Sequence, residues 1–250
     1  MRYIEDGILN KKHILCLHGL GASAGRWEKA LPILAKEYHI VAPDILGFGY
    51  SDKPSVSYTI DFFVNFVKIF MKKLKLESLI LMGASLGGQI AIEIALGYHK
   101  VVECLVLISP SGIMKEPTPA LNRYIAAAMY PTFENAKKAF QGMSSMKNVD
   151  EIYTRDFINR MQLPNAKYAF MSTMMGIKSA PSFVNRLSKI IIPTLIVSGK
   201  KDALIPSKYA KQFHSRIKDS KLVIMEDFGH SPYFEKPDIF SKMVLKFLKN

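Results

Sequence analysis

Residues 79–89 constrain the fold more strongly than any other part of the sequence. Four apolar residues lead into Gly83-Ala84-Ser85-Leu86-Gly87, and a segment of helical period follows. A sharp strand-to-helix turn of this kind strains the backbone of its central residue and exposes that residue's side chain above a sheet. The residues two positions before and after must be very small, because larger side chains would collide with the strand and the helix. The segment therefore predicts a strand, a tight turn that presents the Ser85 hydroxyl, and a helix.

Short runs of branched apolar residues alternate with longer segments of helical period along most of the chain. Several of these runs are apolar almost throughout, which is typical of strands that are covered on both faces of a parallel sheet. We therefore predict an α/β fold with a mostly parallel central sheet and helices on both faces. The predicted strands span residues 3–8, 13–17, 39–42, 78–82, 102–108, 194–197 and 221–225, and the predicted helices span 59–74, 86–97, 207–216 and 237–248.

One long segment interrupts this alternation. It contains no run typical of a strand, and prolines separate its helical pieces. We predict a helical cap at residues 113–185, inserted into a core formed by residues 1–112 and 186–250. Methionine side chains are flexible and polarizable, so a methionine-rich surface suits varied apolar substrates. The methionines of this segment are explained equally well if they fill an irregular small core. Eight of the 13 methionines lie in the segment, namely Met114, Met129, Met143, Met146, Met161, Met171, Met174 and Met175.

A glycine-rich loop follows the predicted strand at residues 13–17. Its sequence, His18-Gly19-Leu20-Gly21, allows a backbone N–H to face a developing oxyanion with no side chain in the way. We predict that Leu20 supplies one such N–H and that Leu86, directly after the serine, supplies the other. His18 precedes the turn, and we expect it to brace this loop rather than to act as a base.

The predicted general base is His230. It follows the strand at residues 221–225, between a glycine and a proline, and therefore lies on a tight loop at the end of a strand. Ligand-binding and catalytic groups of open parallel sheets gather at that edge. The acid that orients the histidine should come from another strand end, and Asp202 follows the apolar run at 194–197. Glu226 and Asp227 are nearer in sequence but belong to the histidine's own loop. A buried Asp202 would fix the histidine tautomer and stabilise the imidazolium.

The order Ser85, Asp202, His230 is that of the α/β-hydrolases. On these motifs, together with residues 18–21, 43–54 and Gly229 before the histidine, the chain resembles the α/β-hydrolase fold superfamily, among its small carboxylesterases and lipases with a helical cap. The resemblance covers nearly the whole chain and is weakest in the cap. We assign the turn-rich segment 43–54 a structural role. Ala84 stands where many relatives have histidine, a position outside the mechanism.

The resemblance, with serine as the nucleophile, implies acyl chemistry rather than dehalogenase or epoxide-hydrolase chemistry. We expect hydrolysis of carboxylic esters with short to medium acyl chains, with no metal or organic cofactor. The main alternative is a carbon–carbon bond hydrolase acting on ring-cleavage products of aromatic degradation, in which Arg155 could bind a substrate carboxylate. A small-molecule receptor without turnover is a further alternative. The predicted pocket residues are Gly19, Met114, Arg155, Phe228 and Tyr233.

The composition of the chain limits the kinds of partner that we expect it to bind. Lys and Arg number 34 and Asp and Glu 21, which gives a formal net charge of +13, yet the lysines are spread over the whole chain. No basic-aromatic cluster is present, so we expect no nucleic-acid partner. No apolar run approaches the roughly 18–20 residues that span a bilayer, and we expect no stable membrane insertion.

Without a secretory signal pattern, and with Cys16 and Cys104 in apolar runs, we expect a cytoplasmic protein with reduced thiols. The sequence is compatible with a homodimer.

Overall fold

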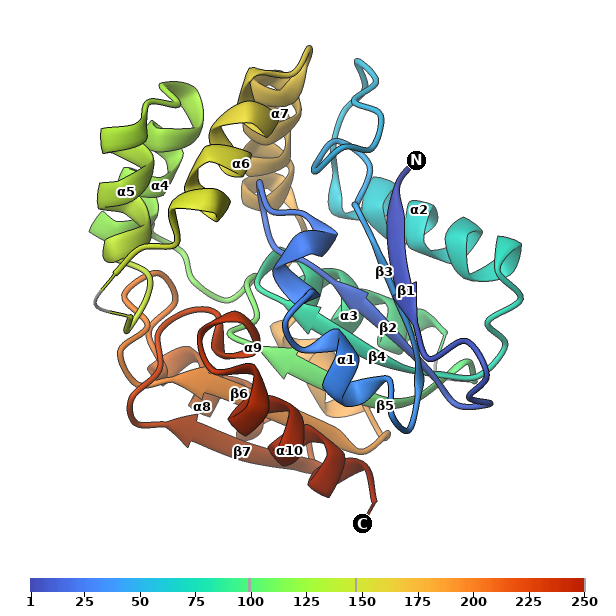
Figure 1. Ribbon diagram of the computed structural model, residues 1–250. Coiled ribbons are helices and arrows are strands. Elements are labelled where there is room, and N and C mark those ends of the chain that lie inside the picture. The colour runs from blue at the N-terminus through green and yellow to red at the C-terminus, as the bar shows by residue number, and fades with distance from the viewer. Residues whose placement is uncertain (99, 147, 250) are drawn as a thin grey trace.

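The computed structural model describes residues 1–98, 100–146 and 148–249. Within them, seven strands form one sheet in the order β1-β3-β2-β4-β5-β6-β7. All neighbours are parallel except β1, which pairs antiparallel with β3. Helices cover both faces (Figure 1), so the predicted α/β architecture is confirmed. The strands are β1 Tyr3–Asp6, β2 His13–Leu17, β3 His39–Pro43, β4 Leu79–Ala84, β5 Val102–Ile108, β6 Thr194–Gly199 and β7 Ser220–Met225.

The central strands are buried on both faces, and their side chains alternate between two cores. On β2, Leu15 and Leu17 pack into one core while Ile14 and Cys16 pack into the other. This alternation follows from the two-residue period of a strand and explains the nearly continuous apolar runs in the sequence. The first core lies beneath α2 Ile60–Lys73, α3 Leu86–Gly97 and α8 Lys208–His214. The second lies beneath the short α1 Leu31–Leu34 and α9 Pro232–Glu235, and α10 Pro237–Leu248.

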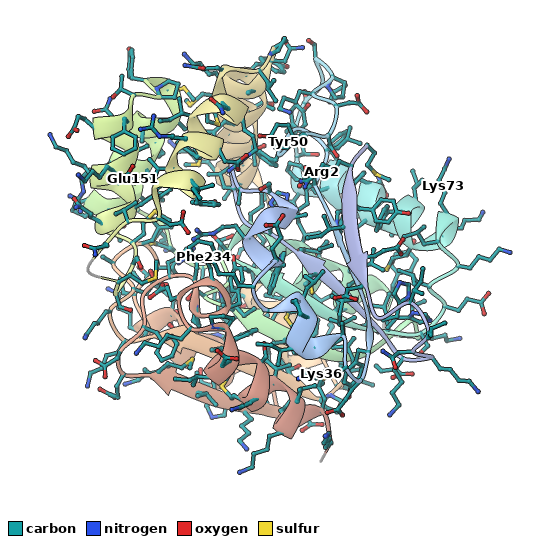
Figure 2. All side chains as sticks on the ribbon, viewed as in Figure 1. Arg2, Lys36, Tyr50, Lys73, Glu151 and Phe234 are labelled. Carbon is teal, nitrogen blue, oxygen red and sulfur yellow. The ribbon has the colours of Figure 1, made fainter. Side chains whose placement is uncertain are left out.

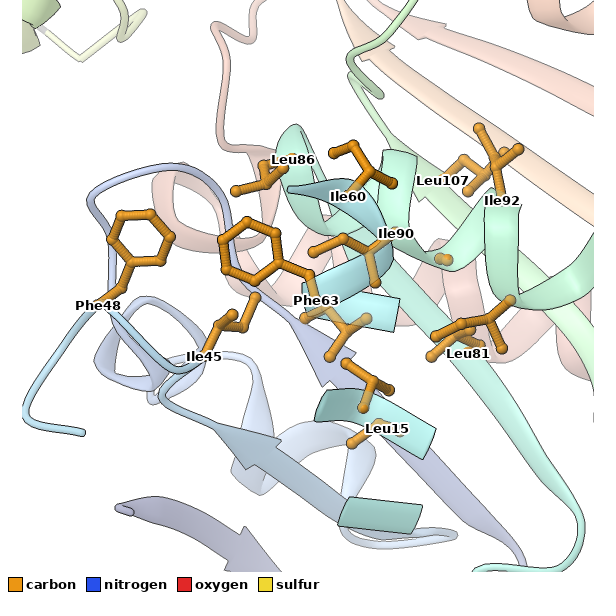
Figure 3. Packing of buried hydrophobic residues seen from close by; sticks show 14 of the residues in the cluster. Leu15, Ile45, Phe48, Ile60, Phe63, Leu81, Leu86, Ile90, Ile92 and Leu107 are labelled. Atoms are coloured by element: carbon orange, nitrogen blue, oxygen red, sulfur yellow. The ribbon is translucent and has the colours of Figure 1, made fainter. Parts of the chain in front are cut away.

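Part of the first core lies between α2, α3 and the middle strands. Figure 3 shows Phe63 of α2 among Leu15, Leu86 and Ile90, with Phe48 stacked beside it. α2 begins where predicted, because the Thr59 side chain accepts a hydrogen bond from the Phe62 N–H and caps the helix. This packing fixes α3, and therefore the turn that precedes it.

Sequence and structure differ mainly at element ends. β1 ends at Asp6 rather than residue 8, because Gly7 turns the chain with a φ of +69°. β4 and β6 each extend two residues beyond their predicted ends, into Ala84 and Gly199, which carries them to the edge where the functional loops begin. The short helices α1 and α9 and the 3₁₀ turn at Ala24–Trp27 were not predicted, since four residues carry too little periodicity.

Between β5 and β6 the described chain forms helices and no strand. Four helices lie together over the sheet edge (Figure 1), namely α4 Pro119–Met129, α5 Phe133–Gln141, α6 Glu151–Gln162 and α7 Ala166–Ser179. We call these helices, with the described residues that connect them to one another and to the core, the helical insertion. Three of them begin at a side-chain cap supplied by Thr118, Thr132 or Asp150. The insertion leaves and rejoins the core at one place, since a Cβ on Gly112 would lie 2.4 Å from the Phe183 ring.

Charged side chains project around the visible outline of the molecule (Figure 2). Lys36 and Lys73, on opposite parts of the core, both extend into solvent (Figure 2). No helix within the described residues is long and apolar enough to cross a membrane. Cys16 and Cys104 are both free and buried. Burial raises the pKa of both thiols, that of Cys104 to about 12, so neither is a reactive thiolate near neutral pH.

Glycine substitutions test how tightly the insertion packs on the core. Gly176 of α7 lies against backbone, and a Cβ there would be 2.3 Å from the Tyr58 carbonyl oxygen. Gly97 of α3 has nothing within 4 Å of its Cβ position. We predict that Gly176→Ala destabilises the protein by about 1–3 kcal/mol, whereas Gly97→Ala is neutral or stabilising by roughly 0.5–1 kcal/mol. Urea unfolding of both variants measures this, and equal effects would contradict close packing at α7.

Candidate active site

The backbone at Ser85 has the strained conformation that the sequence predicts. Its φ is +54° and its ψ is −117°, between the end of β4 and the start of α3. A residue in this region costs of order 1–3 kcal/mol and persists only where the surroundings enforce it. Here Gly83 and Gly87 make the turn sterically feasible, since a Cβ on Gly83 would lie 2.3 Å from the Gly87 carbonyl oxygen.

The loop after β2 packs directly against the serine. A Cβ on Gly19 would lie 3.0 Å from the Ser85 Cβ and 3.6 Å from its Oγ. A Cβ here would make an unusually tight contact, so glycine suits the close approach of this backbone to the serine. The N–H groups of Leu20 and Leu86 donate no hydrogen bond to any described residue, as expected of donors reserved for a ligand.

His230 and Asp202 are joined as predicted. The Nδ1 of His230 lies 2.8 Å from Oδ2 of Asp202, and both residues are buried. The other carboxylate oxygen, Oδ1, accepts hydrogen bonds from the N–H groups of Leu204 and Ile205, at 2.9 Å each. Because a carboxylate can only accept, the proton lies on Nδ1 of the histidine. Its Nε2 is then an acceptor available to a proton from another group.

Glu235 holds the loop of His230, and the sequence reasoning missed it. Its Oε2 accepts from Gly229 N–H at 2.9 Å and its Oε1 from Ser231 N–H at 3.1 Å, on either side of the histidine. The same carboxylate binds the backbone and hydroxyl of Ser145, from the helical insertion. The only sequence signal was an acidic residue five positions after the histidine, which alone would not distinguish it from a surface residue.

His18 braces the glycine-rich loop and is not available as a base. Its Nδ1 donates to the Gly19 carbonyl at 2.8 Å, and its Nε2 accepts from the Ile45 N–H at 2.9 Å. Burial lowers the pKa of His18 to about 4, so the ring is neutral near pH 7. Both ring nitrogens are therefore occupied, one by the Gly19 carbonyl and the other by the N–H of Ile45, which follows β3.

A large cavity opens over the serine. Its volume is about 1060 Å³, at the upper end for small-molecule sites. Ser85 and His230 both line it, together with Gly19, Leu20 and Leu86. The structure contains no hydrogen bond between the hydroxyl of Ser85 and the ring of His230, both of which it describes. Such bonds are often long in unliganded hydrolases and tighten when substrate binds.

The predicted pocket residues divide into two groups. Gly19, Met114 and Tyr233 line the cavity, whereas Arg155 and Phe228 do not. Arg155 is exposed on α6 with its guanidinium 5.0 Å from the centre of the Phe133 ring, and Phe228 is buried in the second core. The prediction that Arg155 and Phe228 line the pocket is therefore wrong. The sequence could not show which side of α6 faces the cavity, because that depends on how the insertion docks.

The methionines of the insertion divide in the same way. Met143 and Met161 are buried in the first core, whereas Met171 and Met175 are among the exposed large hydrophobic side chains. Core packing therefore accounts for some of these methionines, and others lie at the cavity. Those that line the cavity are Met114, Met143, Met174 and Met175.

Cationic side chains also reach the cavity. Arg26 lines it and donates to Ser231 Oγ at 2.8 Å, with its guanidinium over the Tyr153 and Phe234 rings. Lys115 and Lys178 lie at its exposed parts. Among the described residues, no group of three or more His, Cys, Asp or Glu side chains is arranged to hold a metal ion.

Comparison with known proteins places this geometry in a family. The model of the alpha/beta hydrolase fold matches residues 12–237. The chain belongs to the α/β-hydrolase family. It is 29% identical to the 2-hydroxy-6-oxo-6-(2'-aminophenyl)hexa-2,4-dienoic acid hydrolase of Metapseudomonas resinovorans, over 99% of this chain and 87% of that protein.

Two further relatives differ in their reactions. The solved meta-cleavage product hydrolase of Pseudomonas fluorescens IP01 superposes with a TM-score of 0.91 at 26% identity, over 99% of this chain and 93% of that one. The pimeloyl-[acyl-carrier protein] methyl ester esterase of Aeromonas hydrophila is 25% identical over 94% of each chain. The chain is thus similar both to hydrolases named for a dienoic acid or a meta-cleavage product and to a methyl ester esterase.

The neutral state of His18 makes stability depend on pH. Its pKa is lower in the folded protein, about 4, than the unfolded value of about 6.5. The unfolded chain therefore binds more protons between these values, and the free energy of unfolding falls as the pH falls from about 6.5 to 4. We predict a loss of up to about 3 kcal/mol from this group.

His18→Asn is the matched variant, because it removes the titratable ring while its amide N–H can replace the Nδ1 donor to the Gly19 carbonyl. Urea unfolding across this pH range should show a shallower decline for His18→Asn than for the wild type. Parallel pH profiles of the two proteins would contradict the assignment of His18 as a buried neutral brace.

Proposed function

We propose that this protein is a serine hydrolase that cleaves carboxylic esters with short to medium acyl chains through an acyl-enzyme on Ser85. The observation that carries the proposal is the convergence of three strand ends on one cavity. Ser85 lines it in a strained turn, and His230 lines it while bound at 2.8 Å to Asp202. Hydroxyl, imidazole and carboxylate are the groups that nucleophilic acyl transfer requires.

The reaction would proceed in two steps. Nε2 of His230 removes the proton of Ser85 Oγ as this oxygen attacks the ester carbonyl, and the N–H groups of Leu20 and Leu86 bind the resulting oxyanion. His230 then protonates the leaving alcohol, which departs as the acyl-enzyme forms. Water repeats the attack and releases the acid. Asp202 keeps the imidazole in the Nδ1–H tautomer and stabilises the imidazolium in both steps.

The lining of the cavity supports an apolar acyl or alcohol group. Leu121, Ile177 and Leu204 surround the space together with the four methionines. An apolar pocket discriminates by only about 1–3 kcal/mol per methylene, so a range of acyl chains should be accepted. The flexible methionine side chains broaden that range further.

A panel of p-nitrophenyl esters from acetate to decanoate tests the proposal. We predict turnover that is highest for short to medium chains, and a loss of about 10⁶-fold in kcat for Ser85→Ala. Ser215→Ala, at the exposed end of α8, is the control and should retain full activity. A fluorophosphonate should label the wild type on the peptide that contains Ser85.

Substantial ester hydrolysis by purified Ser85→Ala would contradict the assignment of the nucleophile. Tight stoichiometric binding of esters without turnover would favour a receptor instead.

A second candidate is a carbon–carbon bond hydrolase. Two proteins similar over 99% of this chain are named as hydrolases of a 2-hydroxy-6-oxo-hexa-2,4-dienoic acid and of a meta-cleavage product. The residue on which the sequence based this alternative, Arg155, lies outside the cavity. Among the described cationic residues, Arg26, Lys115 and Lys178 line the cavity and are placed to bind a substrate carboxylate.

Turnover of a 2-hydroxy-6-oxo-hexa-2,4-dienoate separates the two candidates. We predict that its kcat/KM is at least tenfold below that of the best p-nitrophenyl ester. The decay of the dienoate absorbance measures this in the same preparation, with Ser85→Ala as the blank. The reverse order of kcat/KM would replace the ester assignment with the carbon–carbon one.

A further inference from the structure

Three consecutive backbone carbonyls in the loop after β2 each accept a hydrogen bond from a side chain. The Gly19 carbonyl accepts from His18 Nδ1 at 2.8 Å, the Leu20 carbonyl from the Tyr124 hydroxyl at 2.8 Å, and the Gly21 carbonyl from Arg160 Nη1 at 2.8 Å. His18 belongs to the core, whereas Tyr124 lies on α4 and Arg160 on α6 of the helical insertion.

These bonds fix the direction of the Leu20 N–H. In a trans peptide the C=O and the N–H point in opposite directions. The Gly19 carbonyl is held toward His18, so the N–H of the same peptide unit, that of Leu20, is turned away from it. The next two peptide units, whose carbonyls Tyr124 and Arg160 hold, fix the chain on the other side of Leu20. The Leu20 N–H therefore lies between one carbonyl held by the core and two held by the helical insertion.

Tyr124 is built into the insertion and faces the loop. Its ring is buried among Phe140, Phe157 and Phe170. Burial raises the pKa of its hydroxyl far above the usual value, so the group remains a donor. A Cβ on Gly21 would lie 2.8 Å from the Tyr124 oxygen. The loop and the insertion are thus in direct contact here.

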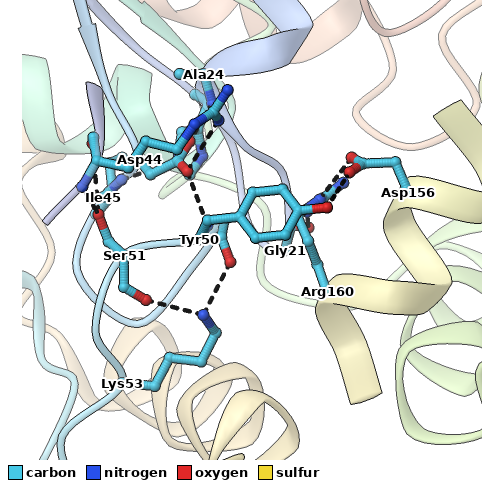
Figure 4. Close-up of polar contacts among 12 residues, drawn as sticks. Gly21, Ala24, Asp44, Ile45, Tyr50, Ser51, Lys53, Asp156 and Arg160 are labelled. Atoms are coloured by element: carbon cyan, nitrogen blue, oxygen red, sulfur yellow. Dashed lines mark hydrogen bonds and ion pairs between the residues drawn. The ribbon is translucent and has the colours of Figure 1, made fainter. Parts of the chain in front are cut away.

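Arg160 is costly to bury, and folding alone does not explain it. Its side chain is 2% exposed and its Nη2 has no hydrogen-bond partner. Its one carboxylate partner, Asp156, is itself partly exposed and also accepts from the Tyr50 hydroxyl, as Figure 4 shows. Apolar side chains often replace such buried charges without loss of stability. What the guanidinium does provide is a charge-assisted bond to Gly21 at 2.8 Å.

We propose that Tyr124 and Arg160 of the helical insertion are positioning residues that hold the 19–21 loop so that the Leu20 N–H is aligned with the oxyanion formed at Ser85. This inference rests on the proposed function, in which Leu20 is an oxyanion donor. If the inference is right, docking of the insertion contributes to stabilisation of the transition state as well as to substrate binding. Deleting an oxyanion donor costs about 10²–10³ in rate. Loosening one should cost less, about tenfold.

Tyr124→Phe tests the proposal with the smallest change. The expected result is a roughly tenfold lower kcat for a p-nitrophenyl ester, with KM changed less than twofold. Affinity for a trifluoromethyl ketone, which forms a tetrahedral oxyanion with a serine, should fall by the same factor. Affinity for the corresponding secondary alcohol, which forms no oxyanion, should not change. A purely structural role would not separate the two inhibitors.

Tyr168→Phe is the matched control. The Tyr168 hydroxyl of α7 also donates to a core carbonyl, that of Val56, at 3.2 Å, but far from the loop in sequence and outside the cavity. It should leave kcat and both inhibitor affinities within twofold of the wild type. If Tyr124→Phe behaves like Tyr168→Phe while the wild type is active, the inference is wrong and the ester assignment stands. If the wild type shows no Ser85-dependent turnover, the proposed function fails and this inference with it.

Arg160 gives an independent check. Arg160→Met should lower kcat and the trifluoromethyl ketone affinity together, and Arg160→Lys, which keeps a cationic donor, should restore part of both. Thermal unfolding reports whether each variant is folded at the assay temperature. An Arg160→Met variant that is folded and fully active would contradict the assignment.

Discussion

Backbone packs directly on backbone beneath Ser85, and the rest of the site depends on this contact. Gly83 lies against the carbonyl of Gly87, and a Cβ on Gly87 would lie 2.3 Å from the carbonyl oxygen of Leu17. The end of β2, the end of β4 and the first turn of α3 are thereby held together with no side chain between them. Interiors packed this closely resist small displacements. The strain at Ser85 is maintained because its neighbours cannot relax.

The helical insertion is joined to the catalytic edge by polar bonds as well as by apolar packing. The backbone N–H of His230 donates to the carbonyl of Met143 at 2.8 Å, and Glu235 links the same loop to Ser145. Tyr124 and Arg160 of the insertion bond to the 19–21 loop on the other side of the site. The insertion therefore contacts both the loop that carries His230 and the loop that carries the Leu20 amide. The helices that shape the cavity therefore also help to order the groups proposed for the chemistry.

The sequence predicted those parts of the site whose chemistry is local. The turn at Ser85 needs glycines at fixed offsets, and Asp202 and His230 each directly follow an apolar strand, so the parallel sheet brings them to one edge. Contacts that depend on how helices dock were not predictable. Arg155 and Arg160 lie on the same helix, and only its orientation places the first in solvent and the second against Gly21. Glu235 was missed because α9 has only four residues, too few for a periodicity that would show its carboxylate turned back toward the His230 loop.

The two ends of the insertion meet where Gly112, with a φ of +103°, packs against Phe183. The excursion of roughly seventy residues between them is thus a closed loop on the scaffold, and closing a loop costs free energy that grows only slowly with its length. The core contacts the insertion through this junction, through polar bonds to the two loops of the site, and through apolar packing that includes Phe157 and Phe170. An exchange of the intervening helices would therefore change the range of molecules accepted and, with Tyr124 and Arg160, the bonds that hold the 19–21 loop.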